Sequence, residues 1–208
     1  MRAHDAVLKA TLRLIADRGI DVTSVDAIAE ASGVSKATIY KHWRTKEELC
    51  LEAIGRVDGQ VPVFDSADPR SDLVELLRHF AQARQPENVG TLWSRIVGYA
   101  SGNPAFGSAL RARFDEPRRA QASRLVRRAI FQGQLRGDLD VDIAPDILFG
   151  PILHRRFSTS NLPADLPEKV VEAFWKANAP GPARSSPKTS SRKQRPFRGA
   201  REAARSNP

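Results

Sequence analysis

The sequence predicts an all-α protein. Apolar residues recur at helical spacing from Val7 to Trp175, strand-like alternation is nearly absent, and breaks containing glycine and proline separate the helical stretches. Apolar residues make up 41% of the 208 residues and charged residues 27%, a composition that allows a buried core. We therefore expect about nine helices, arranged in two domains that are followed by a tail.

The first 55 residues are compact and have short connections. An initial helix ends at Gly19 and carries its apolar residues on one face: Val7, Leu8, Leu12, Ile15 and Ala16. Two short helices follow, and Thr45 with Glu48 has the capping pattern that starts the next helix. Residues 56–69 then form a break that is rich in turn-forming residues.

Helical spacing resumes after the break in five stretches: residues 73–80, 92–100, 106–130, 143–153 and 170–175. The longest of them is expected to break or restart near Pro117, because a proline inside a helix removes one hydrogen bond. Pro145 is acceptable in the first turn of its helix, whereas Pro151 is expected to kink the same helix. From Ala179 onward proline, glycine, serine and arginine dominate, which is typical of a disordered tail.

The net charge of +9 is typical of a nucleic-acid-binding protein, but it is unevenly distributed. Residues 179–208 contain eight Lys and Arg against one acid, whereas residues 1–55 contain eight residues of each sign. The charge is therefore mostly a property of the tail and does not by itself prove specific DNA binding. We expect three parts: a compact N-terminal domain (1–55), a second helical domain (56–178) and a disordered basic tail (179–208).

Several classes of protein are excluded by the composition. No apolar run approaches the roughly 18 residues of a membrane span, and the N-terminus has no signal-peptide pattern, so we expect a cytoplasmic protein. The single cysteine, Cys50, cannot provide a disulfide framework. Because metal-ligand spacings, nucleophile elbows, phosphate loops and dinucleotide fingerprints are missing from the sequence, we expect neither an enzyme nor a cofactor.

One acidic segment needs a separate interpretation. Asp138, Asp140 and Asp142 alternate as in a calcium loop, but the glycine and the distal glutamate of such a loop are missing. We expect no metal site here and interpret the segment as a turn that caps the next helix.

Residues 22–49 carry the chemistry. Thr23 with Asp26 fits a capping box, Gly33 supplies the positive φ of a sharp helix stop, and Ser35 caps a second short helix in which Ile39 points inward. Two short helices joined by such a turn form a helix-turn-helix, whose second helix can enter the major groove of DNA. Between residues 31 and 46 there are four bases, one histidine and no acid, so positive charge is concentrated on this segment.

The same segment resembles the N-terminal domain of the TetR family of bacterial transcriptional regulators. The matching residues are Ile28-Ala29, Gly33-Val34-Ser35, Thr38-Ile39-Tyr40, His42-Trp43 and Lys46-Glu47-Glu48-Leu49, over about residues 5–52. The resemblance implies that DNA phosphates are contacted by Thr23, Lys36, Tyr40, His42 and Lys46. It implies further that Ala37 and Thr38 lie nearest the base edges, while Ser35 serves either role.

Physical chemistry favours some of these roles and opposes others. Tyr40 is expected to face DNA because Ile39 already fills the inward position, whereas Trp43 is expected to pack beneath the motif. Lys46 lies at a helix N-terminus, where a cation opposes the dipole, so we expect a phosphate to be the partner that makes this placement favourable. Since Ala37 has no hydrogen-bonding side chain, part of the specificity is expected to come from DNA shape.

The second domain is expected to sense a ligand or to mediate dimerisation. Six of its apolar residues are candidates for a ligand cavity, as in the pockets of the family, and the alternative is that they are ordinary core residues: Trp93, Ile96, Val97, Phe106, Phe114 and Phe149. Residues 133–153 resemble a C-terminal domain found in one branch of the family. The apolar faces of 143–157 and 166–177 resemble its four-helix dimer interface.

The sequence therefore predicts a sequence-specific regulator of transcription. We expect a homodimeric repressor that binds a palindromic operator in double-stranded DNA and is released by an unidentified small-molecule effector. The alternative is a non-specific architectural DNA-binding protein that acts through its basic tail. An enzyme on an all-α scaffold would need a catalytic constellation that the sequence does not contain.

Overall fold

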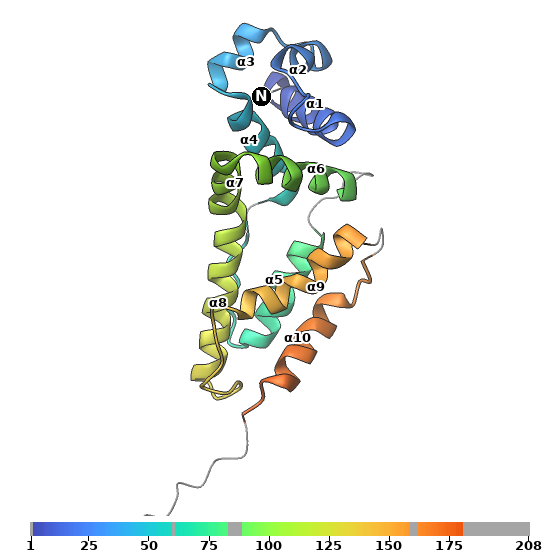
Figure 1. Cartoon of the computed structure of the whole chain (residues 1–208). Helices are drawn as coiled ribbons and strands as arrows, with labels where there is room; N and C mark the ends of the chain where they lie inside the picture. The colour runs from blue at the N-terminus through green and yellow to red at the C-terminus, as the bar shows by residue number, and fades with distance from the viewer. Residues whose placement is uncertain (1, 60, 83–88, 159–161, 181–208) are drawn as a thin grey trace, which may run out of the picture.

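The computed structural model describes residues 2–59, 61–82, 89–158 and 162–180. Within these ranges every regular element is helical, which confirms the predicted all-α class. Figure 1 shows α1 (Arg2–Arg18), α2 (Val25–Ser32), α3 (Lys36–His42), α4 (Lys46–Asp58), α5 (Pro69–Gln82), α6 (Val89–Gly102), α7 (Pro104–Leu110), η1 (Arg111–Asp115), α8 (Glu116–Phe131), α9 (Ala144–Ser158) and α10 (Leu166–Ala177). None of the helices in the described part of the chain is both long and apolar enough to cross a membrane.

Helices α1 to α4 form the end of the molecule that lies at the top of Figure 1. Helix α1 packs against both α2 and α4, and α3 lies next to α2. Their shared core consists of residues at helical spacing: Val7, Leu8, Leu14, Val25, Ile28, Ile39, Trp43, Leu49 and Ala53. This core buries Val7 and Leu8 of the predicted apolar face of α1 and the predicted inward residue Ile39 of α3, whereas Ile15 and Ala16 of the predicted α1 face lie in or against a different core.

A second core lies at the opposite end, where α5, α8, α9 and α10 pack together. The larger buried residues of this core are Leu73, Leu76, Leu77, Phe80, Leu125, Val126, Leu148, Phe149, Ile152, Val170, Val171 and Phe174. A segment before α5 is tied to α8 by ion pairs from Asp65 to Arg124 (3.0 Å) and to Arg128 (2.6 Å). Arg128 also pairs with the buried Asp72 of α5.

The two ends are joined through a third core rather than through a flexible linker alone. This junction core combines buried residues of α1 and its end (Ile15, Ile20) and of α4 (Cys50, Leu51, Ile54, Val57) with residues of α6, α7 and η1 (Leu92, Ile96, Phe106, Phe114). Burial raises the pKa of the Cys50 thiol to about 12, so this thiol stays protonated at neutral pH. Because α4 takes part in two cores, the predicted domain boundary at residue 55 falls inside a helix and stays a prediction.

The predicted stretch 106–130 is continuous but not uniform. It runs as α7, the π-helical turn η1 and α8, with Pro117 in the first turn of α8. A proline inside a continuous helix clashes with the carbonyl four residues earlier, which here is that of Arg113. Arg113 lies in the π-helical turn η1, whose wider backbone accommodates the proline ring. Pro151 lies inside α9, which continues to Ser158. The predicted tail lies outside the described residues from residue 181 onward.

Candidate nucleic-acid interface

The turn between α2 and α3 has the predicted local chemistry. Gly33 ends α2 with a φ of +68°, in the left-handed region that favours glycine. Ser35 is the N-cap of α3, and its Oγ accepts a hydrogen bond from the backbone N–H of Thr38 at 3.2 Å. At the start of α4, Thr45 accepts from the N–H of Glu48 at 3.1 Å. These three predictions are confirmed.

The predicted cap at Thr23 is wrong. Ser24 caps α2 instead, because its Oγ accepts a hydrogen bond from Ala27 N–H at 3.1 Å. Thr23 is 2% exposed, and its hydroxyl donates to the Gly19 carbonyl at 2.6 Å. This bond ties the α1–α2 connection to the end of α1, so a phosphate contact by Thr23 stays a prediction that requires the hydroxyl to turn outward.

Two residues fix α3 against the rest of the domain. Ile39 is 1% exposed and points into the core, as predicted. Trp43, the C-cap residue of α3, is buried and donates from Nε1 to Glu52 Oε2 of α4 at 2.7 Å. The other carboxylate oxygen of Glu52 lies 3.0 Å from His4 Nε2, and the His4 ring stacks on Trp43 with centroids 4.8 Å apart. The structural role predicted for Trp43 is confirmed, and α3 is anchored to the domain through Ile39 and at its C-terminal end through Trp43.

The outer surface of α3 is exposed and carries the predicted DNA-facing residues. Tyr40 is 50% exposed, and Lys36, Ala37 and His42 are exposed as well. The half-buried Thr38 places its hydroxyl 2.8 Å from that of Ser35. The structure therefore brings these six residues together on one short helix and its cap. A surface of this size fits into the major groove of DNA, which admits an α-helix.

Lys36 has a protein partner on the same surface. Its Nζ lies 2.5 Å from Asp26 Oδ1 of α2, and the hydrogen bond to this carboxylate raises the pKa of Lys36. Lys36 is therefore charged at neutral pH. Its partner, Asp26, is expected from the sequence only in a capping box. Both side chains are more than half exposed, so solvent and salt screen this pair.

Lys46 is placed differently from the expectation. Its Nζ donates to the carbonyls of Ile20 (2.8 Å) and Asp21 (3.4 Å), just beyond the end of α1, and lies 5.7 Å from the centre of the Tyr99 ring. The inference that a phosphate is needed to make a cation favourable at this position is wrong, because carbonyls at the end of α1 do so. A phosphate contact by Lys46 stays a prediction.

Two contacts join this end of the molecule to α6. The Tyr99 hydroxyl donates to Glu47 Oε1 at 2.9 Å, and Arg95 donates to the Asp17 carbonyl of α1 at 3.0 Å. Burial and the bond to Glu47 raise the pKa of Tyr99 to about 12, so the phenol stays a neutral donor. No local pattern indicates these contacts, since the partners are separated by 52 and 78 residues.

The six residues proposed for a ligand cavity do not surround one common space in the described part of the chain. Ile96, Phe106 and Phe114 are buried in the junction core, and Trp93 packs at its edge. Val97 is 44% exposed, and Phe149 belongs to the core at the opposite end. Five of the six lie in or against two separate cores, and a single sequence cannot distinguish such core residues from the lining of a cavity, so their role in ligand binding stays a prediction.

The acidic segment 138–142 behaves as a turn. Asp140 accepts hydrogen bonds from the N–H groups of Asp142 (3.0 Å) and Ile143 (3.3 Å), just before α9. Among the residues that the structure describes, no group of three or more histidine, cysteine or acidic side chains could hold a metal ion.

Comparison with known proteins agrees with this geometry. Residues 7–53 match the family described as "Bacterial regulatory proteins, tetR family", and residues 63–174 match "Tetracyclin repressor-like, C-terminal domain". The "Uncharacterized HTH-type transcriptional regulator YdeS" of Bacillus subtilis (strain 168) is 32% identical over 174 residues, which are 82% of this chain and 87% of that protein.

Two further proteins are similar over most of their length. The "DNA-binding transcriptional repressor TetR" of Mycobacteroides abscessus is 28% identical over 155 residues, 72% of this chain and 80% of that protein. The solved structure of the "Flavonoid-responsive Regulator FrrA" superposes with a TM-score of 0.60 at 27% identity and covers 86% of this chain and 98% of that one. The similarity thus extends over both helical domains and is not confined to the helix-turn-helix.

Proposed function

Because the chain belongs to the TetR family of helix-turn-helix transcriptional regulators, we propose that it is a repressor that binds a palindromic operator as a homodimer and is released by a small molecule. The observation that carries the proposal is the outer surface of α3, where Lys36, Ala37, Tyr40 and His42 are exposed above a buried Ile39. A relative of similar length is named a DNA-binding transcriptional repressor, which supports repression over activation.

In the proposed complex α3 lies in the major groove. Lys36, Tyr40 and His42 contact phosphates from its exposed surface, and Ala37 lies nearest the base edges, where its methyl group suits an apolar contact with thymine. Arginine, asparagine and glutamine, whose planar groups read guanine or adenine with two hydrogen bonds, do not occur in α3, and of its two lysines Lys36 is assigned to a phosphate. The width and deformability of the operator therefore contribute to specificity.

The proposed dimer is formed through α9. Ile143, just before this helix, and Ile147 and Leu153 within it are 50%, 46% and 39% exposed, an apolar surface that water disfavours. The outer face of α10 carries ion pairs from Lys169 to Asp165 and from Lys176 to Glu172 instead. We therefore assign the centre of the dimer interface to α9, with α10 at its rim. A two-fold dimer reads half-sites separated by about 34 Å, one turn of DNA.

The proposed effector acts through the junction core. A protein with a similar fold is named flavonoid-responsive, which supports control by a small organic molecule. Helix α4 shares buried residues with α6, α7 and η1, so a ligand that moves these helices also moves α4 and the helix-turn-helix. A ligand that binds better to the conformation with wrongly spaced recognition helices shifts the population off DNA.

Fluorescence anisotropy tests the proposal with the full chain and labelled DNA from upstream of its own gene, in excess unrelated competitor and over a salt series. Lys36→Ala is expected to weaken binding and to reduce the salt slope by about 0.9 for each phosphate that is no longer neutralised, so by about 2 in a dimer. Arg136→Ala removes one positive charge from the turn between α8 and α9, which lies far from α3 and outside α9 and α10, and is the control.

Two results decide between the alternatives. An operator-binding regulator that reads DNA with α3 is supported if binding is selective, is weakened by Tyr40→Ala and by Lys36→Ala, and is unchanged by Arg136→Ala. The non-specific architectural protein is supported instead if the competitor abolishes binding equally on every DNA and if none of these substitutions alters binding. Light scattering of Ile147→Lys tests the dimer, which is expected to become a monomer.

A further inference from the structure

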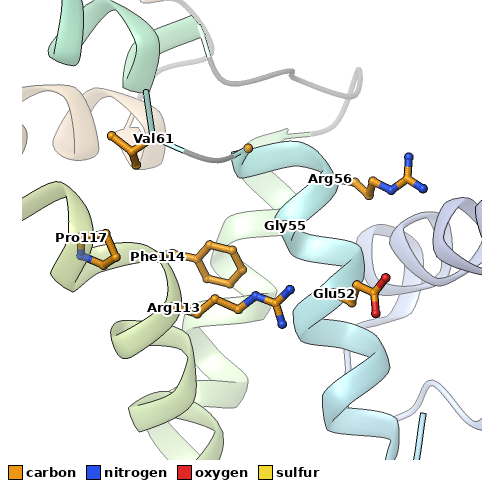
Figure 2. A pocket seen from close by; sticks show the side chains of 8 residues that line it. Glu52, Gly55, Arg56, Val61, Arg113, Phe114 and Pro117 are labelled. Carbon is orange, nitrogen blue, oxygen red and sulfur yellow. The ribbon is translucent and has the colours of Figure 1, made fainter. Parts of the chain in front are cut away.

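A cavity of about 520 Å³ opens between α4 and the η1–α8 segment (Figure 2). Helix α4 contributes Glu52, Gly55 and Arg56 to its wall, and the opposite wall contains Arg113, Phe114 and Pro117. The volume lies within the range of about 300–1,000 Å³ that small-molecule sites occupy. The six residues proposed from the sequence include Phe114 but none of the charged groups in this wall.

Gly55 of α4 lines the cavity beside Phe114. A Cβ at residue 55 would lie 3.5 Å from Phe114 Cε1, an ordinary van der Waals contact, so packing does not require a glycine here. Glycine in a helix interior is less favourable than alanine because it loses more conformational freedom on folding. Glycine therefore stands where alanine would suit the helix better and would narrow the cavity by one methyl group.

The charges around the cavity are unevenly satisfied. Both oxygens of Glu52 are engaged by Trp43 and His4, and Arg56 pairs with Asp5. The Arg113 guanidinium lies over the Phe114 ring, 5.7 Å from its centre, and points toward α4 in Figure 2. Within the described residues no carboxylate lies within ion-pair distance of Arg113. Among the side chains that the structure describes, which do not include that of Asp58, the cavity thus combines an aromatic wall with a cation, Arg113, that has no ion pair with a carboxylate.

We propose that this cavity is the effector site and that it takes a small organic anion with a flat apolar body, such as an aromatic carboxylate. Arg113 binds the carboxylate through parallel N–H···O bonds, and the ligand's apolar body lies in the cavity between α4 and the η1–α8 segment, against the accessible edge of Phe114. This assignment of a ligand class rests on the proposed function. The ligand bridges α4 and η1, so it favours one spacing between the helix-turn-helix and the second domain.

Isothermal calorimetry without DNA tests the site, with 2-naphthoate as the probe and neutral 2-naphthamide as its matched analogue. Wild type is expected to bind the anion about tenfold or more tightly than the amide. Arg113→Gln is expected to remove this preference while binding of the amide is kept, and Arg113→Lys is expected to restore part of it. Gly55→Met is expected to abolish binding of both compounds, because its side chain fills the cavity.

Arg111→Gln, which removes a neighbouring exposed arginine that does not line the cavity, is the control and is expected to bind as wild type does. Circular dichroism of each variant establishes that it is folded. Equal affinity for anion and amide, or binding that survives both Arg113→Gln and Gly55→Met, overturns the proposal.

A second measurement separates the two proposals, since calorimetry does not depend on an operator. Addition of 2-naphthoate to the complex with DNA is expected to lower the anisotropy of wild type but not that of Arg113→Gln. If 2-naphthoate binds in a way that depends on Arg113 but does not dissociate the DNA complex, the cavity is an anion site and not the effector site. A chain that binds no DNA selectively refutes the proposed function, and the calorimetric result still decides on the anion site.

Discussion

Substitution of Gly33 isolates the energetic contribution of one backbone conformation. Gly33 ends α2 with a φ of +68°, and a Cβ built there meets no heavy atom of the described residues within 4 Å. Gly33→Ala therefore creates no clash, and its whole effect comes from placing an L side chain in the left-handed region. This is expected to destabilise the folded state by about 1–2 kcal/mol. Gly33→Asn is expected to be milder, since asparagine tolerates this region better.

Gly98 provides a matched control. A Cβ at residue 98 also meets no described atom within 4 Å, but the residue lies inside α6 and has no positive φ. Gly98→Ala is expected to stabilise the protein by about 0.5–1 kcal/mol, because alanine loses less freedom in a helix. The same chemical change is thus expected to have opposite signs at two positions that differ only in backbone conformation.

Urea denaturation monitored by circular dichroism measures both effects. The variants are comparable when the free energy of unfolding falls with urea concentration at the same slope as in wild type. Amide hydrogen exchange in α3 detects the case in which the turn opens locally before the whole chain unfolds. Gly33→Ala that leaves both the urea midpoint and the exchange of α3 unchanged refutes the reasoning, as does a Gly98→Ala variant that is destabilised to the same extent.

Three further predictions concern a titration, a core residue and an ion pair. The pKa of Tyr99 is raised from 10.0 to about 12, so the stability contributed by this group is fully present below pH 10 and is lost as the pH rises toward 12. Ultraviolet titration of wild type should therefore show a late phenol ionisation that Tyr99→Phe lacks. Identical titration curves for the two proteins contradict this prediction. Ile39→Ala is expected to destabilise the protein by about 2–5 kcal/mol and to abolish operator binding, measured by urea denaturation and anisotropy, whereas unchanged stability contradicts the buried position of Ile39. Asp26→Asn frees Lys36 for a phosphate, so operator binding should become tighter and more salt-dependent; a weaker complex contradicts this role.

Much of the helix-turn-helix is predictable because its determinants are local. The positive φ of Gly33, the cap at Ser35 and the inward position of Ile39 each depend on residues within four positions along the chain. Local hydrogen bonds and helical periodicity are the properties that a single sequence indicates. The same reasoning fails at Thr23, where two neighbouring hydroxyl residues compete and Ser24 makes the cap while Thr23 bonds back to α1.

The contacts that could not be predicted join residues far apart in the chain. Lys46 is bonded to carbonyls 26 and 25 residues earlier, and no periodicity indicates that α1 ends beside the start of α4. The apolar residues of the second domain are predictable as buried, but their division between the junction core and the core around Phe149 is a property of the tertiary arrangement. The cavity beside Arg113 escaped prediction for the same reason, since its walls come from segments nearly 60 residues apart.

Helix α4 connects the proposed effector site to the DNA-reading surface within a short distance. Glu52 and Gly55 are three residues apart, so they lie on neighbouring positions of one helix face. Gly55 and Glu52 both line the cavity, and Glu52 accepts the hydrogen bond of Trp43, the C-cap residue of α3. A ligand can therefore act on α3 by displacing Glu52 or by shifting α4 as a rigid body. In both cases the effect passes through the hydrogen bond between Glu52 and Trp43. In the proposed mechanism, the buried Trp43 is thus the point at which occupancy of the cavity reaches the surface that is proposed to contact DNA.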